Sequence, residues 1–223
     1  MIEIIPAIMP KDYEHLDEMM SLFVGVVPLV QLDIMDGKFV PARTWPYPKD
    51  PHFDAIIAEE EGMPRWEDIN FEVDLMVENP EAVVSKWVSA GASRVIVHVE
   101  SMKDFEKIRA AVPEGLIELG LAINTTTSID VLAPYCHRID FVQCMGIARI
   151  GFQGEPFDER VLDQVRVARS TRPDMPISVD GAVNMETAKR LVETGATRLV
   201  SGSAILEADD FTQAIAEMKN LVS

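Results

Sequence analysis

The chain has 223 residues, of which 37 are acidic and 20 are basic, giving a formal net charge of −17. A surface of this charge repels nucleic acid and anionic membranes, which argues against a polyanion-binding role. The length and a hydrophobic fraction of 48 % fit one globular domain over residues 1–223. Two cysteines without metal-ligand spacing, no apolar stretch long enough to span a bilayer and no signal-peptide pattern predict a cytoplasmic protein.

In chain order, short apolar stretches alternate with segments of helical periodicity. We expect strands within residues 2–9, 29–35, 69–77, 93–100, 117–124, 139–146, 175–181 and 197–202. We expect helices over about residues 12–24, 51–61, 80–90, 104–111, 158–171, 185–194 and 211–221, and a short one near Ile129. Strands that alternate with helices favour parallel strands joined by crossovers.

Eight such units predict an α/β fold, a single-domain (β/α)8 TIM barrel. A doubly wound open sheet is the structural alternative, and it typically carries a glycine-rich phosphate loop after its first strand. The first strand here leads into "AIMPKDYE", which contains no glycine. The barrel is therefore the favoured fold.

Acidic residues interrupt three apolar strands near their predicted carboxyl ends, at Asp33, Asp74 and Asp180. A lone aspartate at a strand end is more often a turn residue, and that interpretation is the better one for Asp36, which a glycine follows. His98 fits a hydrogen-bonded core residue better than a ligand. Three carboxylates at the same end of parallel strands favour one shared site, because barrel active sites lie at that end.

Glycine-rich turns follow the last three predicted strands, at residues 150–157, 180–183 and 201–205. Glycine lets backbone N–H groups approach an anion closely. The loops after strands 7 and 8 form the usual phosphate site of this fold. Together the turns predict a ligand that carries a phosphate group.

Several segments together resemble the ribulose-phosphate 3-epimerase family. They are "IIPAIM", "QLDIMDGKFVPA", "FEVDLMVENP", "AGASRVIVHVE", "GLAINTTTS", "GFQGEPF", "VDGAVN" and "TRLVSGSAI", and they run through nearly the whole chain. The resemblance implies interconversion of D-ribulose 5-phosphate and D-xylulose 5-phosphate by two aspartates on opposite faces of the sugar, here Asp33 and Asp180. Inversion beside a carbonyl needs a base on one face and an acid on the other, which agrees with a carboxylate pair.

The resemblance also implies substrate contacts and a divalent metal. The contacts would be Met35, Met76, Met145, Gly151, Phe152, Gln153, Gly154, Gly181, Ala182, Gly202 and Ser203. The family's metal ligands are two histidines and the two aspartates, and the histidine positions here hold Gln31 and Asp74. Gln31, Asp33, Asp74 and Asp180 would form an all-oxygen set, which suits Mg²⁺ or Mn²⁺ better than Zn²⁺. Arg149 is an alternative source of positive charge, and no organic cofactor is expected.

Two other functions stay open from the sequence. The changed metal positions are compatible with a non-catalytic phosphosugar-binding barrel that has lost its metal. A barrel enzyme with aldol or decarboxylation chemistry is the third candidate, although the strand-end residues singled out here include no lysine for a Schiff base. The resemblance implies a homo-oligomer that binds a small phosphosugar. The net charge and the short apolar stretches predict that it binds neither nucleic acid nor membrane.

Overall fold

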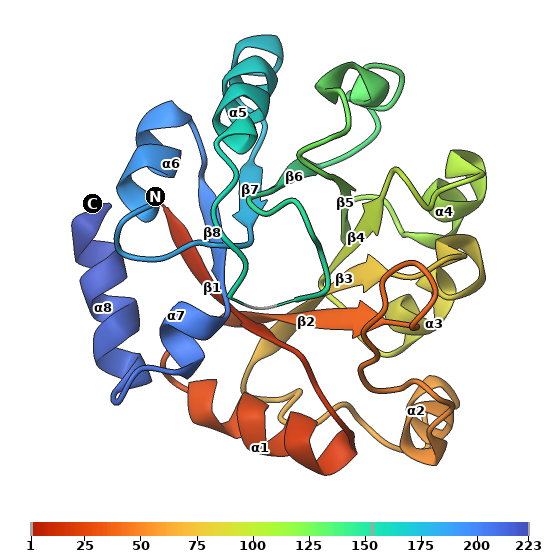
Figure 1. Cartoon of the computed structure of the whole chain (residues 1–223). Helices are drawn as coiled ribbons and strands as arrows, with labels where there is room; N and C mark the ends of the chain where they lie inside the picture. The colour runs from red at the N-terminus through yellow and green to blue at the C-terminus, as the bar shows by residue number, and fades with distance from the viewer. Residues whose placement is uncertain (1, 153, 223) are drawn as a thin grey trace. The chain divides into compact units, whose positions relative to one another are not determined.

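The computed structural model describes residues 2–152 and 154–222, and its strands form a closed parallel barrel in the order β1 to β8 (Figure 1). The strands are β1 (Glu3–Ile8), β2 (Leu29–Met35), β3 (Asn70–Met76), β4 (Arg94–His98), β5 (Glu118–Ile123), β6 (Phe141–Met145), β7 (Ile177–Asp180) and β8 (Arg198–Ser201). This topology confirms the predicted (β/α)8 barrel and rules out the doubly wound open sheet.

Helices connect the strands, as the alternating pattern predicts. They are α1 (Tyr13–Phe23), α2 (Pro51–Ile57), α3 (Val84–Ser89), α4 (Phe105–Ala111), α5 (Arg160–Thr171), α6 (Ala188–Thr194), α7 (Ser203–Leu206) and α8 (Phe211–Leu221), with 3₁₀ turns η1 (Pro80–Ala82) and η2 (Ile129–Leu132). None of the helices among the described residues is long and apolar enough to cross a membrane.

Four helices begin at an aspartate whose side chain accepts a hydrogen bond from a backbone N–H of the first turn. These caps are Asp12 for α1, Asp50 for α2, Asp104 for α4 and Asp210 for α8. Such a cap stabilises a helix by about 1 kcal/mol, because it satisfies a donor that has no partner within the helix. Part of the acidic excess therefore serves the fold.

Two predicted helices differ most from the structure, and α6 also begins later than predicted, at Ala188. The periodicity predicts a helix as far as residue 61, but α2 ends at Ile57 because Glu59 takes a left-handed φ of 60°. The backbone N–H groups of Glu59 and Glu60 then bond back to the carbonyls of Ile56 and Ala55, a helix-terminating arrangement. In the segment predicted as one helix over 80–90, η1 and α3 are separate elements with Val83 between them.

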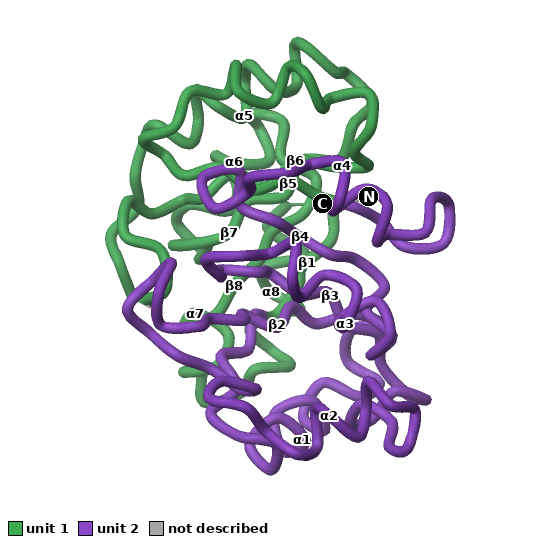
Figure 2. The backbone as a smooth tube through the Cα atoms, turned by 90° about the vertical axis from the view of Figure 1, so that its right-hand side faces the viewer, with its two compact units in different colours: residues 1–6, 120–223 green, residues 7–119 purple. Residues whose placement is uncertain are grey.

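Contacts between Cα atoms divide the chain into two compact units, residues 7–119 and residues 1–6 with 120–223 (Figure 2). In the first unit, the buried ring of Trp45 packs edge-on against Phe53 and Trp87, with ring centroids 5.3 and 5.9 Å away. In the second unit, α6 packs against both α5 and α8. The expectation of one domain over residues 1–223 stays a prediction.

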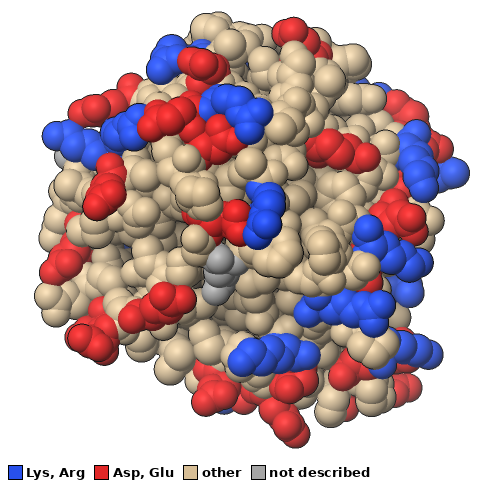
Figure 3. All heavy atoms as spheres, in the orientation of Figure 1, with Lys and Arg blue, Asp and Glu red and all other residues tan. Residues whose placement is uncertain are grey.

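Acidic and basic side chains lie interspersed on the molecular face drawn in Figure 3. Elsewhere in the described chain, independently of this view, basic residues pair with acids, such as Arg65 with Asp17 at 2.8 Å. On this face, the acidic excess is therefore not gathered into a single patch.

Candidate functional site

Strands β2 and β3 carry a row of polar residues on one face. Their parallel register places Gln31 opposite Glu72 and Asp33 opposite Asp74. Successive side chains of a strand point to opposite faces, so residues two apart share a face. The intervening residues are apolar and fully or almost fully buried: Val30, Leu32, Ile34, Phe71, Val73 and Leu75. This alternation explains how an apolar stretch can carry carboxylates without placing them against the hydrophobic layer.

Asp33 is 8 % exposed. One hydrogen bond fixes its carboxylate and another fixes its backbone carbonyl. The side-chain Nε2 of Gln31 donates to Asp33 Oδ1 at 2.9 Å. Thr44, in the loop after β2, donates its hydroxyl to the Asp33 carbonyl at 2.7 Å and accepts from the Met35 N–H at 2.9 Å. The carboxylate is therefore oriented by its own strand and the strand end is tied to the loop. Nothing in the sequence pattern pointed to Thr44.

Asp74 is fully buried and contacts His98, which is also fully buried at the end of β4. His98 Nε2 lies 3.1 Å from Asp74 Oδ1, and His98 Nδ1 lies 3.7 Å from Glu100 Oε2. Burial alone would lower the pKa of His98, but the charges of Asp74 and Glu100 and their hydrogen bonds outweigh it and raise the pKa to about 10. The structure confirms that His98 is a hydrogen-bonded core residue.

Asp36 is a turn residue, as the sequence predicts. Its Oδ1 accepts from the backbone N–H groups of Lys38 and Phe39, and its Oδ2 accepts from the N–H of Glu78 at 2.9 Å. The carboxylate thus joins the loop after β2 to the loop after β3. Asp36 therefore stabilises the conformation of these two loops.

Asp180 ends β7 and is 8 % exposed. Its backbone carbonyl accepts from the N–H of Gly146 at 2.6 Å, which draws the ends of β6 and β7 together. A Cβ on Gly146 would lie 2.1 Å from the carbonyl oxygen of Gly181, so a side chain cannot be accommodated there. Gly181 has a φ of 100° and Ala182 a φ of 53°, and the sharp turn begins immediately after the aspartate.

The glycine turn after β6 is held by its own side chains. Arg149 pairs with Glu155 at 2.6 Å and its guanidinium lies 5.0 Å from the ring centroid of Phe152. The Arg149 side chain is 68 % exposed, so the structure gives it a partner in the turn and does not support the interpretation that it supplies the site with positive charge. Gly151 and Gly154 both have positive φ, and Gln153 lies outside the described residues.

All three aspartates that interrupt the strands are buried. Asp33 and Asp74 lie directly opposite each other in the register of β2 and β3, and Asp180 ends β7. Carboxylate oxygens are ligands that suit Mg²⁺ or Mn²⁺. The donor types therefore fit the kind of cation that the sequence predicts.

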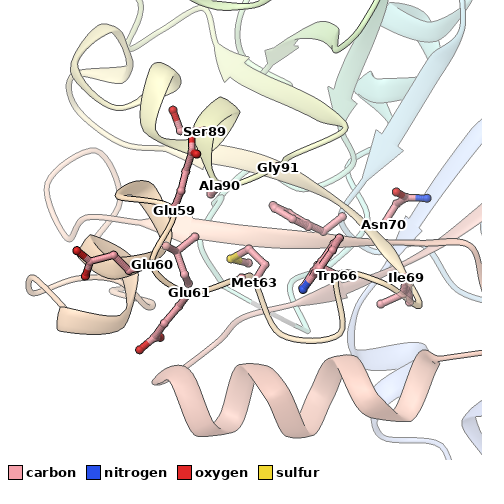
Figure 4. A pocket seen from close by; sticks show the side chains of 13 residues that line it. Glu59, Glu60, Glu61, Met63, Trp66, Ile69, Asn70, Ser89, Ala90 and Gly91 are labelled. Carbon is pink, nitrogen blue, oxygen red and sulfur yellow. The ribbon is translucent and has the colours of Figure 1, made fainter.

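A separate pocket of about 570 Å³ lies at the amino-terminal ends of β3 and β4. Asn70 and Phe71 begin β3 on one side of it, and Ser89 to Gly91 precede β4 on the other. Figure 4 shows Glu59 and Glu60 with Trp66 around this pocket. The predicted site residues are not among its lining residues, so it is a different region of the same strands.

The model of the ribulose-phosphate 3-epimerase family matches residues 3–206. The chain belongs to this family. It is 29 % identical to the ribulose-phosphate 3-epimerase of Bacillus subtilis (strain 168), over 98 % of this chain and 99 % of that protein. It is 30 % identical to the one of Chlamydia pneumoniae, over 92 % of this chain and 87 % of that protein.

Solved structures agree on the fold. A 3-hexulose-6-phosphate synthase superposes with a TM-score of 0.70 at 20 % identity, covering 100 % of both chains. The orotidine 5'-phosphate decarboxylase of Pyrococcus horikoshii has a TM-score of 0.65 at 16 % identity, over 98 % of this chain and 98 % of that one. At this level of identity the likeness shows a shared barrel and carries no conclusion about activity.

Proposed function

We propose that this protein is an isomerase that inverts C3 of a ketose phosphate and interconverts D-ribulose 5-phosphate and D-xylulose 5-phosphate. The observation that carries the proposal is the burial of two carboxylates near the carboxyl ends of their strands, Asp33 on β2 and Asp180 on β7, where parallel barrels carry their chemistry. Membership of a family named for this reaction supports the same reaction class.

The chemistry needs two proton-handling groups. The C3 proton lies next to the C2 carbonyl, so its removal leaves an enediolate whose charge rests on oxygen. We assign one of Asp33 and Asp180 to take this proton and the other to return one on the opposite face, with the roles exchanged for the reverse reaction. One proton leaves and one is gained, so the two sugars differ only at C3.

We assign a divalent cation, Mg²⁺ or Mn²⁺, to Asp33, Asp74 and Asp180, with Gln31 as a neutral oxygen ligand. When bound, the cation supplies positive charge beside the oxygens on which negative charge develops. Gln31 also directs its Nε2 at Asp33 Oδ1 and so holds that carboxylate in place.

We assign the remaining predicted contacts to the substrate. The buried side chains of Met35, Met76 and Met145 would exclude water from the sugar. The phosphate would bind backbone N–H groups around Gly181, Ala182, Gly202 and Ser203, with Gly151, Phe152 and Gly154 closing the other side. The positive φ values at 151, 154 and 181 support this, because such turns can present N–H groups to an anion. We further propose a cytoplasmic homo-oligomer.

The test is turnover of D-ribulose 5-phosphate in D₂O with Mg²⁺ or Mn²⁺, followed by NMR. We expect D-xylulose 5-phosphate with deuterium at C3. Tight phosphosugar binding with neither inversion nor exchange would contradict the proposal and favour the non-catalytic binding barrel, which the changes at positions 31 and 74 motivate. Release of CO₂ or cleavage of a C–C bond would instead favour the third candidate.

A further inference from the structure

Asp74 stands where the family pattern has a histidine, and this exchange places an additional carboxylate in the site. Asp74 is fully buried and lies directly opposite Asp33 in the β2–β3 register. A buried carboxylate is costly unless an opposite charge or hydrogen bonds compensate it. Some group in this chain must therefore hold Asp74.

His98 is placed to hold it. Its Nε2 lies 3.1 Å from one oxygen of Asp74 and 3.5 Å from the other, so the ring nitrogen faces the carboxylate between its two oxygens. The other ring nitrogen, Nδ1, lies 3.7 Å from Oε2 of Glu100. The imidazole therefore has an acid on each side.

The backbone around His98 is firmly anchored. Its carbonyl accepts from the N–H of Ser101, the N–H of Met102 and the hydroxyl of Ser101. The ring of Phe39 lies 5.4 Å from the imidazole, measured between centroids. A ring held by its strand end, by Phe39 and by Glu100 has little freedom to move away from Asp74.

We infer that His98 is the positioning residue for Asp74: it donates Nε2–H to the carboxylate and fixes its direction toward a divalent cation. This inference rests on the cation site of the proposed function. Groups that orient metal ligands typically affect metal affinity about 10- to 100-fold.

The test measures Mn²⁺ binding to purified protein without substrate, by isothermal titration calorimetry, for two variants of similar size. His98→Gln keeps an amide N–H near the position of Nε2, within reach of Asp74. His98→Asn keeps a donor near the position of Nδ1, which faces Glu100. We expect the His98→Gln variant to bind Mn²⁺ within about 3-fold of the unchanged protein and the His98→Asn variant to lose about 10- to 100-fold. His137→Asn, at an exposed histidine, is the control and should change nothing.

The same substitutions in an Asp74→Asn background show whether His98 acts through Asp74. There His98→Asn should cost less than about 3-fold, because no carboxylate remains to be held. The inference is overturned if the His98→Gln and His98→Asn variants lose Mn²⁺ affinity equally. It is also overturned if His98→Asn costs as much affinity in the Asp74→Asn background, or if the unsubstituted protein binds no Mn²⁺. If the protein turns over ribulose 5-phosphate but binds no Mn²⁺, the inference about His98 fails and the proposed isomerase activity stands. If the variants show the expected order of Mn²⁺ affinities but the protein has no turnover, the role of His98 stands and the proposed activity fails.

Discussion

Strands β3 and β4 carry two buried acid–base pairs, one at each end, and the pairs differ in their partners. At the amino-terminal end, Glu72 lies directly opposite Arg94, with 3.2 Å between Oε2 and the guanidinium. Arg94 also lies 3.5 Å from Glu118 on β5. Two residues further along β3, Asp74 pairs with His98. The same two strands thus repeat an acid–base motif with arginine at one end and histidine at the other.

The basic partners differ in a way that suits the Glu72–Arg94 pair to stabilising the fold and the Asp74–His98 pair to taking part in chemistry. A guanidinium stays charged at every relevant pH and offers a fixed fork of donors, so Glu72 and Arg94 form a permanent link. At the other end, the imidazole of His98 lies between two carboxylates, those of Asp74 and Glu100. In parallel barrels the carboxyl end of the strands carries the chemistry and the amino end serves stability. We therefore expect substitutions at the two ends to change different measured quantities.

Adding a negative charge to the glycine turns should have a large effect on ligand affinity. Gly202→Asp would place a carboxylate beside the assigned phosphate site, after β8. A like charge about 4–5 Å away costs roughly 3–4 kcal/mol at an effective dielectric constant of about 20, so the dissociation constant for ribulose 5-phosphate should rise about 200- to 1,000-fold. Gly202→Asn, of the same size without the charge, is the matched control. If the two variants bind equally well, the phosphate lies elsewhere.

Breaking the amino-terminal pair should lower stability and leave chemistry intact. Glu72 is 1 % exposed and Arg94 13 %, so Glu72→Gln leaves a largely buried guanidinium with a weaker partner. Removal of one partner of a buried pair costs about 3–5 kcal/mol, and we expect the lower end because Glu118 remains. Urea unfolding measures this change, and the kcat of the folded variant should stay within about 2-fold. A large fall in kcat with normal stability would contradict the division between the two ends.

The smallest effect is expected at the pocket of Figure 4. Trp66 is 64 % exposed. Trp66→Gln should change the free energy of unfolding by no more than about 0.5 kcal/mol, as is usual for surface positions, and should not change turnover. A clear loss of turnover would show that this end of the strands also takes part in function.

The sequence predicted the order of elements well because its apolar stretches are separated by clear helix signals. It predicted Asp33, Asp74 and Asp180 near the carboxyl ends of apolar strands, and β2, β3 and β7 carry them there. It did not predict that Asp74 meets His98, because that contact depends on the β3–β4 register, which sets Asp74 opposite Ile96 and leaves His98 further along β4. The hydrogen bonds of Thr44 to the end of β2 were also not predicted, because a threonine in a loop belongs to no recognisable sequence motif. The early end of α2 depended on a left-handed glutamate that composition does not indicate.

The most direct test of the central claim, that Asp33 and Asp180 act on opposite faces of C3, is solvent exchange in the two asparagine variants. Asp33→Asn and Asp180→Asn should each lower inversion about 100- to 10,000-fold. In D₂O, the base that remains in each variant faces the proton of only one epimer. We predict that NMR will detect deuterium at C3 of ribulose 5-phosphate with one variant and of xylulose 5-phosphate with the other, in both cases without inversion. Full epimerase activity in both variants, or exchange of the same epimer by both, would contradict the account.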